Sequence, residues 1–384
     1  MDFKLTEEQL MIQQAAREFA QQQCLPGVIE RDENQIVPKE QLKQLANLGL
    51  LGMMTNPTYG GAGMDTVSYV LAMEEISKVD SSVSVAMSVN NSLVCWGLEE
   101  YGSEAQKQKY LTPLAQGIKD EALYIGAFLL SEPEAGSDAT HQHTSAVKEG
   151  DHYIINGVKN WITNGSTASV YLVIAQTDYT KGHKGINAFI VEKNTPGVSV
   201  GAKENKMGIR GSDTHAVSFM DVKVPAENRI GEEGFGFNFA MKTLNGGRIG
   251  IAAQALGIAS GAYELALAYS KERKTFGKPI HEHQAIQFKL AEMATRIETA
   301  RLLCFKAAWE KDNHLDYTTT AAMAKLYASD VAMWVTVEAV QVHGGYGFVK
   351  EYHVERLMRD AKITQIYEGT SEIQKMVIGR SITR

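Results

Sequence analysis

The stretch MRDAKITQIYEGTSEIQ, residues 358–374, places an aromatic side chain, a carboxylate and a glycine in immediate succession near the end of the chain. A hydrophobic run ends at Ile366, and Ser371 with Gln374 forms an S-x-x-Q capping box, which predicts a helix that starts just after Glu368. A carboxylate fixed on such a tight connection, beside a bulky aromatic, suits a general base. The alternative is an acid placed before a helix N-terminus because the helix dipole favours negative charge there.

Composition and charge narrow the class of protein. The chain has 384 residues, of which 44% are hydrophobic and 22% are charged. That is enough for a large core and for two or three domains. Its net charge of −7 favours neither nucleic acid nor an anionic membrane surface as a partner. No run of about 18 apolar residues is present, so we expect no membrane span.

The start of the chain and the cysteines bear on the compartment. Residues 1–4, MDFK, lack the features of a secretory signal and of a transit peptide. Cys24, Cys95 and Cys304 are far apart and odd in number, which fits a reducing compartment and gives neither a disulfide framework nor a thiolate metal site. We expect a bacterial cytoplasmic protein or, if the chain is a processed eukaryotic one, a protein of the mitochondrial matrix.

Residues 1–118 predict an N-terminal helical domain. Capping boxes formed by Thr6 with Gln9 and by Ser103 with Gln106 mark two helix starts. Other helices are expected from Pro38 to Gly49, from Asp65 to about Val79, and from about Ser82 to Gly97.

Residues 119–230 predict an antiparallel β-domain. Short runs rich in aliphatic and β-branched residues are separated there by turns that contain glycine and asparagine. The pattern does not alternate strands with helices, and no G-x-G-x-x-G follows a strand. Both absences argue against a nicotinamide-binding Rossmann domain. Strands are expected at 123–130, 153–155, 170–175, 186–191 and 216–224.

Residues 231–384 predict a C-terminal helical bundle. Long helices are expected at 234–271, 281–311 and 318–342, the last ending at His343-Gly344-Gly345. Small residues at 246–250, Gly257 and Gly261 predict close packing between these helices. The fold class is therefore α+β and multidomain, in the order helices, β-domain, helices.

Residues 358–374 resemble the active-site segment of the acyl-CoA dehydrogenases, flavoenzymes that oxidise acyl-CoA thioesters to trans-2-enoyl-CoA. The similarity is closest to the short-chain, butyryl-CoA branch and runs from Leu5 to the end of the chain. It implies the fold of that family, with a barrel-like middle domain and a C-terminal four-helix bundle. It also implies FAD as the cofactor, since no side chain accepts a hydride. Glu368 would then be the base that removes the α-proton.

The segment 128–138 resembles the family's flavin-binding strand and loop. The resemblance implies that Phe128 contacts the flavin, that the Leu130 backbone and the Ser131 hydroxyl bond the ring edge, and that Ser137 bonds the substrate. Most members have threonine where this chain has Ser131, and the hydroxyl is retained. Taken alone, the segment is also typical of a strand followed by a polar turn.

A second flavin motif is Asn160-Trp161-Ile162-Thr163-Asn164. By the resemblance, Trp161 packs on the flavin, Ile162 belongs to the same binding segment, and the Thr163 hydroxyl reaches the N5 region. The motif by itself is weak evidence, but its presence after the first one is a specific signal.

Two further segments resemble those that hold the rest of FAD. One reaches across a subunit interface to a neighbour's pyrophosphate and adenine, and the other lets FAD approach closely through its glycines. Without the resemblance, the first would be a basic cluster at a helix end. By the resemblance, the first segment, 273–277 followed by Gln284, assigns Arg273, Thr275, Phe276 and Gln284 to FAD, and the second, 341–347, assigns Gln341, Gly344 and Gly345. Thr370 and Glu372, beside the expected base, would complete the FAD contacts.

The substrate side is assigned in the same way to Asn245, Arg248, Tyr367 and Gly369. Arg248 would contact the CoA moiety, and Tyr367 would wall the acyl chain. The family usually has aspartate where this chain has Asn245. In the isovaleryl and long-chain branches the base lies at the position of Gly247, so glycine there together with Glu368 indicates the short- and medium-chain branches.

The resemblance also implies partners: an acyl-CoA substrate, an electron-transferring flavoprotein as electron acceptor, and a second copy of the chain, typically in a homotetramer. Residues 89–96 are expected to floor the acyl slot, with short branched or medium chains as alternatives to butyryl. An oxidase that uses oxygen and a non-catalytic flavin- or CoA-binding relative are the alternative functions. The pairs His141/His143 and His281/His283 lack a third ligand at metal-site spacing, so no metal is expected.

Overall fold

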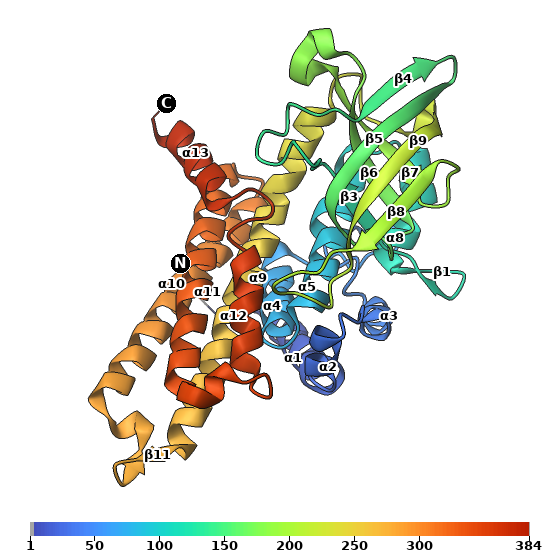
Figure 1. Ribbon diagram of the computed structural model, residues 1–384. Coiled ribbons are helices and arrows are strands. Elements are labelled where there is room, and N and C mark those ends of the chain that lie inside the picture. Colours follow the sequence, from blue (N-terminus) through green and yellow to red (C-terminus); the bar gives the residue numbers. More distant parts are fainter. Residues whose placement is uncertain (1–3, 384) are drawn as a thin grey trace.

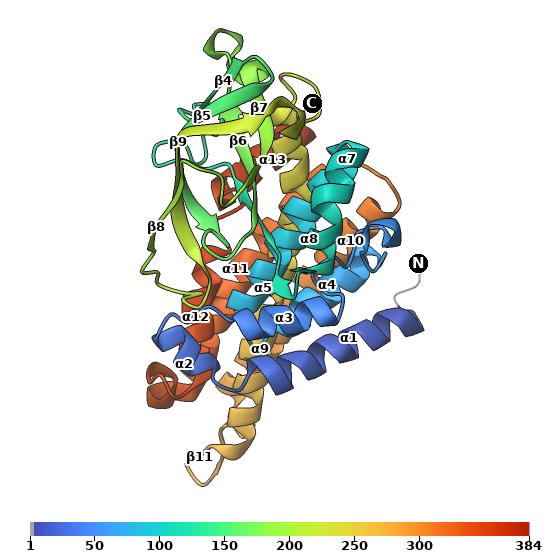
Figure 2. The same cartoon turned by 90° about the vertical axis from the view of Figure 1, so that its right-hand side faces the viewer.

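The structure, a computed structural model, describes residues 4–383. The expectation drawn from the first three residues lies outside this range. N-terminal helices lie between a β-sheet on one side and the long C-terminal helices on the other (Figures 1 and 2). The order helices, sheet, helices is as predicted. The chain changes from helix to strand at β1 (Ile118–Lys119) and back to helix at α9 (Gly236–Glu272). The domain boundaries themselves stay predictions.

The N-terminal segment begins its helices where its sequence provides caps. Thr6 with Gln9 and Ser103 with Gln106 form the predicted capping boxes. The Asp65 side chain caps a third helix by accepting from the backbone N–H of Ser68. The elements of this segment are α1 (Glu7–Phe19), η1 (Ala20–Cys24), α2 (Val28–Glu33), α3 (Lys39–Asn47), η2 (Pro57–Tyr59), α4 (Thr66–Ser77), α5 (Ser81–Ser88), η3 (Val89–Cys95), α6 (Trp96–Tyr101), α7 (Glu104–Gln106), η4 (Lys107–Leu111) and α8 (Thr112–Gln116).

The apolar helix expected over 82–97 is not uniform. It begins one residue earlier, because Asp80 caps α5, and it widens into the π-helical segment η3 before it continues as α6. Two buried asparagines in η3 bond to the loop that precedes α4: Asn90 donates to the Leu51 carbonyl, and Asn91 accepts from the backbone N–H of Met53. These bonds fix η3 against the loop.

The middle segment forms an eight-stranded sheet in the order β10-β7-β6-β4-β5-β9-β8, with β3 also paired to β6. Most pairs are antiparallel, as predicted, but β3 and β4 pair with β6 in parallel. The end strands β10 and β8 pair with β7 and β9 but, among the described residues, not with each other, so hydrogen bonding leaves the sheet open. The strands β4 and β8 were not predicted. The strands of this sheet and the short β2 are β2 (Ala122–Leu123), β3 (Gly126–Leu129), β4 (Ser145–Glu149), β5 (His152–Thr163), β6 (Val170–Gln176), β7 (Ile186–Glu192), β8 (Val198–Lys203), β9 (Thr214–Pro225) and β10 (Arg229–Ile230).

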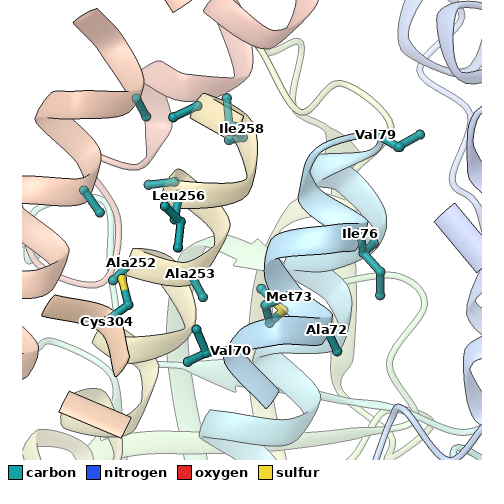
Figure 3. Packing of buried hydrophobic residues seen from close by; sticks show 14 of the residues in the cluster. Val70, Ala72, Met73, Ile76, Val79, Ala252, Ala253, Leu256, Ile258 and Cys304 are labelled. Carbon is teal, nitrogen blue, oxygen red and sulfur yellow. The ribbon is translucent and has the colours of Figure 1, made fainter. Parts of the chain in front are cut away.

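The helix α9 is the axis of the C-terminal bundle and packs against α4, α10, α11 and α12. Its glycines allow the predicted close packing, because a Cβ at Gly257 would lie 2.4 Å from the Glu74 carbonyl oxygen of α4. Figure 3 shows Val70 and Met73 of α4 facing Ala253 and Leu256 of α9. The other helices of the bundle are α10 (Gln284–Asp312), α11 (Thr318–His343), α12 (His353–Ile363) and α13 (Ser371–Ile382).

Although it has no unbroken apolar run, α9 is long and apolar enough on average to cross a membrane. However, 72% of its most apolar window is buried inside the protein. Its apolar character therefore serves the bundle core, as in the core helices of other folded proteins.

The far end of the bundle carries a small hairpin. The strands β11 (Lys274–Thr275) and β12 (Lys278–Pro279) follow α9 and lead through η7 (Ile280–Glu282) into α10. The helix α11 ends beside them at His343, where Gly344 has a φ of 61°, and η8 (Gly344–Phe348) follows. Both views place this hairpin at the end of the bundle opposite α13 (Figures 1 and 2).

Candidate active site

The turn before α13 holds Glu368 in an unusual backbone conformation. Glu368 has a φ of 51° and Gly369 a φ of 92°. The cap of α13 is Thr370, whose side-chain oxygen accepts from the N–H of Ile373 at 3.3 Å. The predicted capping box of Ser371 with Gln374 is therefore wrong by one residue. The two left-handed residues bring Thr370, rather than Ser371, into the capping position.

Gln374 has a different role from the predicted one. Its side-chain amide donates to the carbonyl oxygens of Glu368, at 3.2 Å, and of Gly369, at 2.8 Å. The side chain of Lys325, which is fully buried in α11, donates to the same Gly369 carbonyl at 2.7 Å. Two side chains thus hold the backbone of the turn in place.

The carboxylate of Glu368 points at α9. A Cβ at Gly247 would lie 2.0 Å from Oε2 of Glu368 and 2.8 Å from Cδ2 of Leu93 in η3. This Oε2 is buried and has no hydrogen-bond partner among the described residues. Burial raises the pKa of Glu368 to about 7, against the opposing pull of Lys325 and Arg248. A carboxylate in this state is a good proton acceptor near neutral pH.

Arg248 follows Gly247 in α9 and is buried, and its positive charge acts on the Glu368 carboxylate. Its guanidinium donates to the Asn245 side chain at 2.6 Å, and Asn245 donates in turn to the Thr318 hydroxyl at 3.1 Å. The Nε of Arg248 is buried without a partner among residues 4–383. Asn245, where the family usually has aspartate, therefore orients Arg248 without neutralising its charge.

Tyr367 is fixed beside Glu368 by a hydrogen-bond chain. Its hydroxyl donates to Oε1 of Gln254 in α9, and the Gln254 amide donates to the Ser81 carbonyl at 3.0 Å. Burial and the Glu368 charge hold the pKa of Tyr367 well above its usual value. The tyrosine is therefore a neutral wall that helps to keep water from the carboxylate.

The two predicted flavin motifs meet in the sheet. The backbone N–H of Asn160 donates to the Ser131 carbonyl at 2.9 Å, and the buried Lys159 donates to the Leu130 carbonyl at 2.9 Å. A register shift in β5 after Lys159 turns Trp161 outward, with a φ of 62° and 60% of its surface exposed. This exposed indole face is available to a planar ring.

The remaining residues of these motifs differ in accessibility. The hydroxyls of Ser131 and Thr163 make no hydrogen bond within the described part of the chain, so both are free to bind a ligand. Phe128 packs near Phe239, with 6.2 Å between ring centroids, and Ser137 is exposed. The Ile162 side chain, however, is 2% exposed and belongs to the sheet core, so only its backbone can contact a cofactor.

A pocket of about 570 Å³ lies at the far end of the bundle, between the hairpin and the end of α11. Its lining includes Arg273, Thr275, Gly344 and Gly345, which come from both of the segments assigned to the rest of FAD. Added Cβ atoms at the two glycines would meet no atom within 4 Å. The pocket therefore unites two sequence motifs that lie far apart in the chain.

Exposed side chains surround this pocket. Phe276, at the tip of the hairpin, is 95% exposed, and the Arg273 guanidinium lies 5.6 Å from the centroid of the Tyr346 ring. Gln284 and Gln341 are exposed at neighbouring helix ends. Within the described residues its ring has an edge-to-face contact with His283, at 5.9 Å between centroids, and most of its surface is left open to solvent.

The pocket and the Glu368 turn belong to opposite ends of α11. Lys325 contacts the turn, whereas Gly344 lines the pocket, and a helix advances about 28 Å between these positions. Thr370 and Glu372 lie with the turn. One copy of the chain thus gathers the predicted FAD residues into two separate groups.

Three domain families match the chain in order. They are the N-terminal domain of acyl-CoA dehydrogenase over 6–118, the middle domain over 127–222 and the C-terminal domain over 234–383. The chain is also 53% identical over 384 residues to a protein of Clostridium acetobutylicum described as "Acyl-CoA dehydrogenase, short-chain specific", with each chain covered completely. The chain belongs to the acyl-CoA dehydrogenase family.

Solved structures of this family agree with the fold. Butyryl-CoA dehydrogenase from Megasphaera elsdenii has a TM-score of 0.97 and is 51% identical, with both chains covered completely. A chain from a structure reported for the electron transferring flavoprotein of Acidaminococcus fermentans also has a TM-score of 0.97, with 50% identity and complete coverage of both chains.

FAD is the cofactor of the acyl-CoA dehydrogenases, and the residues of this chain fit it. The exposed face of Trp161 and the unpartnered hydroxyls of Ser131 and Thr163 suit a planar, hydrogen-bonding ring. Arg273 and the open glycines of the distal pocket suit a pyrophosphate, which needs cationic donors and close backbone approach. The individual contacts stay predictions.

Sequence reasoning missed Lys325, Gln254 and the true role of Gln374. Lys325 lies in an apolar helix and gives no local signal, and its role follows only from the packing of α11 under the turn. Within residues 4–383 no group of three histidine, cysteine or acidic side chains is placed to hold a metal. His141 pairs with Asp138, and His283 contacts Thr275.

Proposed function

We propose that this chain oxidises a short-chain acyl-CoA, with butyryl-CoA as the preferred substrate, to the trans-2-enoyl-CoA, and that Glu368 is the base. The proposal rests on the Glu368 carboxylate, whose Oε2 is buried against Gly247 with no hydrogen-bond partner in residues 4–383 and whose pKa is raised to about 7. The names of the similar proteins, short-chain specific and butyryl-CoA dehydrogenase, support the chain length.

In this account Glu368 takes the proton from the α-carbon. FAD, when bound, supplies the acceptor for the hydride that leaves the β-carbon. The backbone N–H of Glu368 makes no hydrogen bond within the described residues, so it is free to donate to the thioester oxygen, where negative charge develops. Tyr367 and the apolar Leu93 exclude water from the same space, which strengthens both interactions.

The substrate's position follows from the same elements. Leu93 of η3 lies against Gly247, so η3 borders the site on the side expected for the acyl chain. Arg248 is the cation available to the CoA side, held by Asn245. Ser137 and Gly369 stay predicted substrate contacts.

We further propose that the active site needs at least two copies of the chain. The hairpin with Phe276 lies at the opposite end of the bundle from the turn, and its pocket completes an FAD site only if a second copy brings its own flavin strand there. A homotetramer would satisfy this requirement. An electron-transferring flavoprotein is proposed as the electron acceptor, supported by the similar chain in the Acidaminococcus fermentans structure.

Product analysis tests the proposal. FAD-loaded protein is incubated with butyryl-CoA, isobutyryl-CoA or octanoyl-CoA and an electron acceptor, and enoyl-CoA is quantified. We expect the highest kcat/KM with butyryl-CoA and a loss of about 10²- to 10⁴-fold in Glu368→Gln, since a base is removed outright. Glu99→Gln is the matched control, because Glu99 is also half-buried with a raised pKa and lies outside the site.

Two outcomes would support the alternatives. Hydrogen peroxide formed in step with product under air, in place of transfer to the flavoprotein, would indicate an oxidase. No product from any of the three thioesters, with FAD bound, would favour a non-catalytic binding protein.

A further inference from the structure

Lys325 is a buried cation under the proposed base. Its side chain is fully buried in α11, and its one hydrogen bond among the described residues goes to the Gly369 carbonyl, at 2.7 Å. Burying an ammonium group with so few partners is costly unless a nearby negative charge compensates. Glu368, the residue that precedes Gly369, supplies that negative charge.

We propose that Lys325 is a positioning residue of the active site, whose ammonium group holds the Gly369 carbonyl and keeps the Glu368 carboxylate ionised. This inference rests on the proposed function, because it assigns Lys325 a role through the base. It does not require Lys325 to touch the substrate or FAD.

The geometric part of the role concerns the left-handed turn. Consecutive positive φ values at Glu368 and Gly369 are strained for the glutamate and need support from their surroundings. Lys325 and Gln374 both donate to the Gly369 carbonyl and so prevent the peptide from rotating. Gln374 also donates to the Glu368 carbonyl, so the two peptides that follow the Cα of Glu368 are both held in place.

The electrostatic part follows from the charges around Glu368. Lys325 from α11 and Arg248 from α9 favour its ionised form, in that order, while burial opposes it. Tyr69 from α4 and the adjacent Tyr367 are neutral groups on the other sides, each with a pKa above the usual value.

The pKa of Lys325 is also shifted, by burial and by the charges around it. Burial lowers its pKa to about 8, whereas the charges of Glu368, Asp330 and Glu372 oppose that change. Arg248 disfavours the ammonium form. Ionised Lys325 and ionised Glu368 therefore stabilise each other, and removing the ammonium group should make the carboxylate harder to ionise.

The test separates the tether from the charge. Lys325→Gln retains a side-chain donor for the Gly369 carbonyl but has no charge, Lys325→Met has neither, and Lys325→Arg retains the charge. Each FAD-loaded variant is titrated with pH by infrared spectroscopy, without substrate. The band of the protonated Glu368 carboxyl is identified by its loss in Glu368→Gln. FAD content and melting temperature are recorded in parallel.

We expect the Glu368 titration to move up by about one pH unit in the Gln and Met variants, the size typical of losing a nearby opposite charge, and to stay in place in the Arg variant. The acidic limb of kcat/KM for butyryl-CoA should move with it. Lys325→Met, which also loses the tether, should have the lower rate on the alkaline plateau. Lys311→Gln is the matched control, because Lys311 also has its pKa lowered to about 8 by burial but its charge partners are Asp312, Glu100 and Glu99.

The inference is overturned if the band titrates at the wild-type pH in folded, FAD-loaded Gln and Met variants. Failure of the proposed function would be seen in a different measurement, the activity of Glu368→Gln. In that case Glu368→Gln would retain activity, whether or not the infrared titration depends on Lys325.

Discussion

Gly247 and Glu368 form a steric pair: a Cβ at Gly247 would lie 2.0 Å from Oε2 of Glu368. Only a residue without a side chain at position 247 leaves room for the carboxylate. The helix α9 accepts the glycine despite its low helix propensity because the surrounding core holds the helix in place. The glycine is thus a requirement of the proposed base rather than of the helix.

Gly247→Ala should displace the carboxylate. We expect kcat to fall by about 100-fold, the effect of misplacing a catalytic group by roughly 1 Å. Folding should be retained, since alanine favours the helix by about 1 kcal/mol. The matched control is Gly246→Ala, where an added Cβ would meet the Ser92 carbonyl oxygen only at 3.6 Å and Nζ of Lys311 at 4.0 Å. Equal activity in both variants would show that the carboxylate does not need this space.

Glu368 should make the protein less stable as the pH rises. Its pKa in the folded protein, about 7, is above the ordinary value of 4.5. The group therefore favours folding fully below about pH 4.5, and that stabilisation is lost as the pH rises through 7. Compared with Glu368→Gln, wild type should be less stable at pH 8.5 by on the order of 2–3 kcal/mol, allowing for partial exposure of the residue. Urea unfolding at pH 5 and 8.5 measures this, and a gap that does not widen with pH would contradict it.

Trp161 should contribute to FAD binding without supporting the fold. It is 60% exposed at the register shift of β5. Trp161→Ala should weaken FAD binding about tenfold through lost ring contact, and Trp161→Phe should restore most of it. The unfolding free energy of the apoprotein should change by no more than about 0.5 kcal/mol in either variant. Unchanged FAD affinity in the alanine variant would place the ring elsewhere.

The ion pair of Arg356 and Asp360 should stabilise α12, which leads into the Glu368 turn. Both side chains are buried, at 3.2 Å, and Asp360 also accepts from the backbone N–H of Ile209. Arg356→Met should cost about 3 kcal/mol because it leaves a buried carboxylate unpaired. With Asp360→Asn in the same chain, the combined cost should fall short of the sum by about 1 kcal/mol. Strict additivity in urea unfolding would show that the two side chains do not interact.

The order of the three segments and most helix starts could be predicted, because caps such as Thr6 with Gln9 are local signals. The placement of Glu368 on a tight turn was also predictable. The cap of α13 was not, since Thr370 and Ser371 are both good caps and only the left-handed φ values of Glu368 and Gly369 decide between them. The parallel pairing of β3 with β6 depends on long-range packing and has no local pattern.

In the candidate site, too, the sequence alone could not predict contacts that depend on long-range packing. Motif resemblance named Glu368, Trp161 and Arg248, but Lys325 reaches the turn only because α11 packs beneath it. Likewise, Ile162 is part of a predicted motif, yet alternation along β5 turns its side chain into the core. A resemblance identifies positions, whereas the direction of a side chain depends on strand register and helix packing.

The most direct test of the central claim is an anaerobic titration of purified, FAD-loaded protein with butyryl-CoA, alongside Glu368→Gln. We expect the absorbance of the oxidised flavin to disappear in wild type with a stoichiometric amount of substrate and to persist in the variant. If butyryl-CoA, octanoyl-CoA and isobutyryl-CoA all leave the wild-type absorbance unchanged, the proposed reaction is contradicted for these substrates. If the variant loses its absorbance as fast as wild type, Glu368 is not the base.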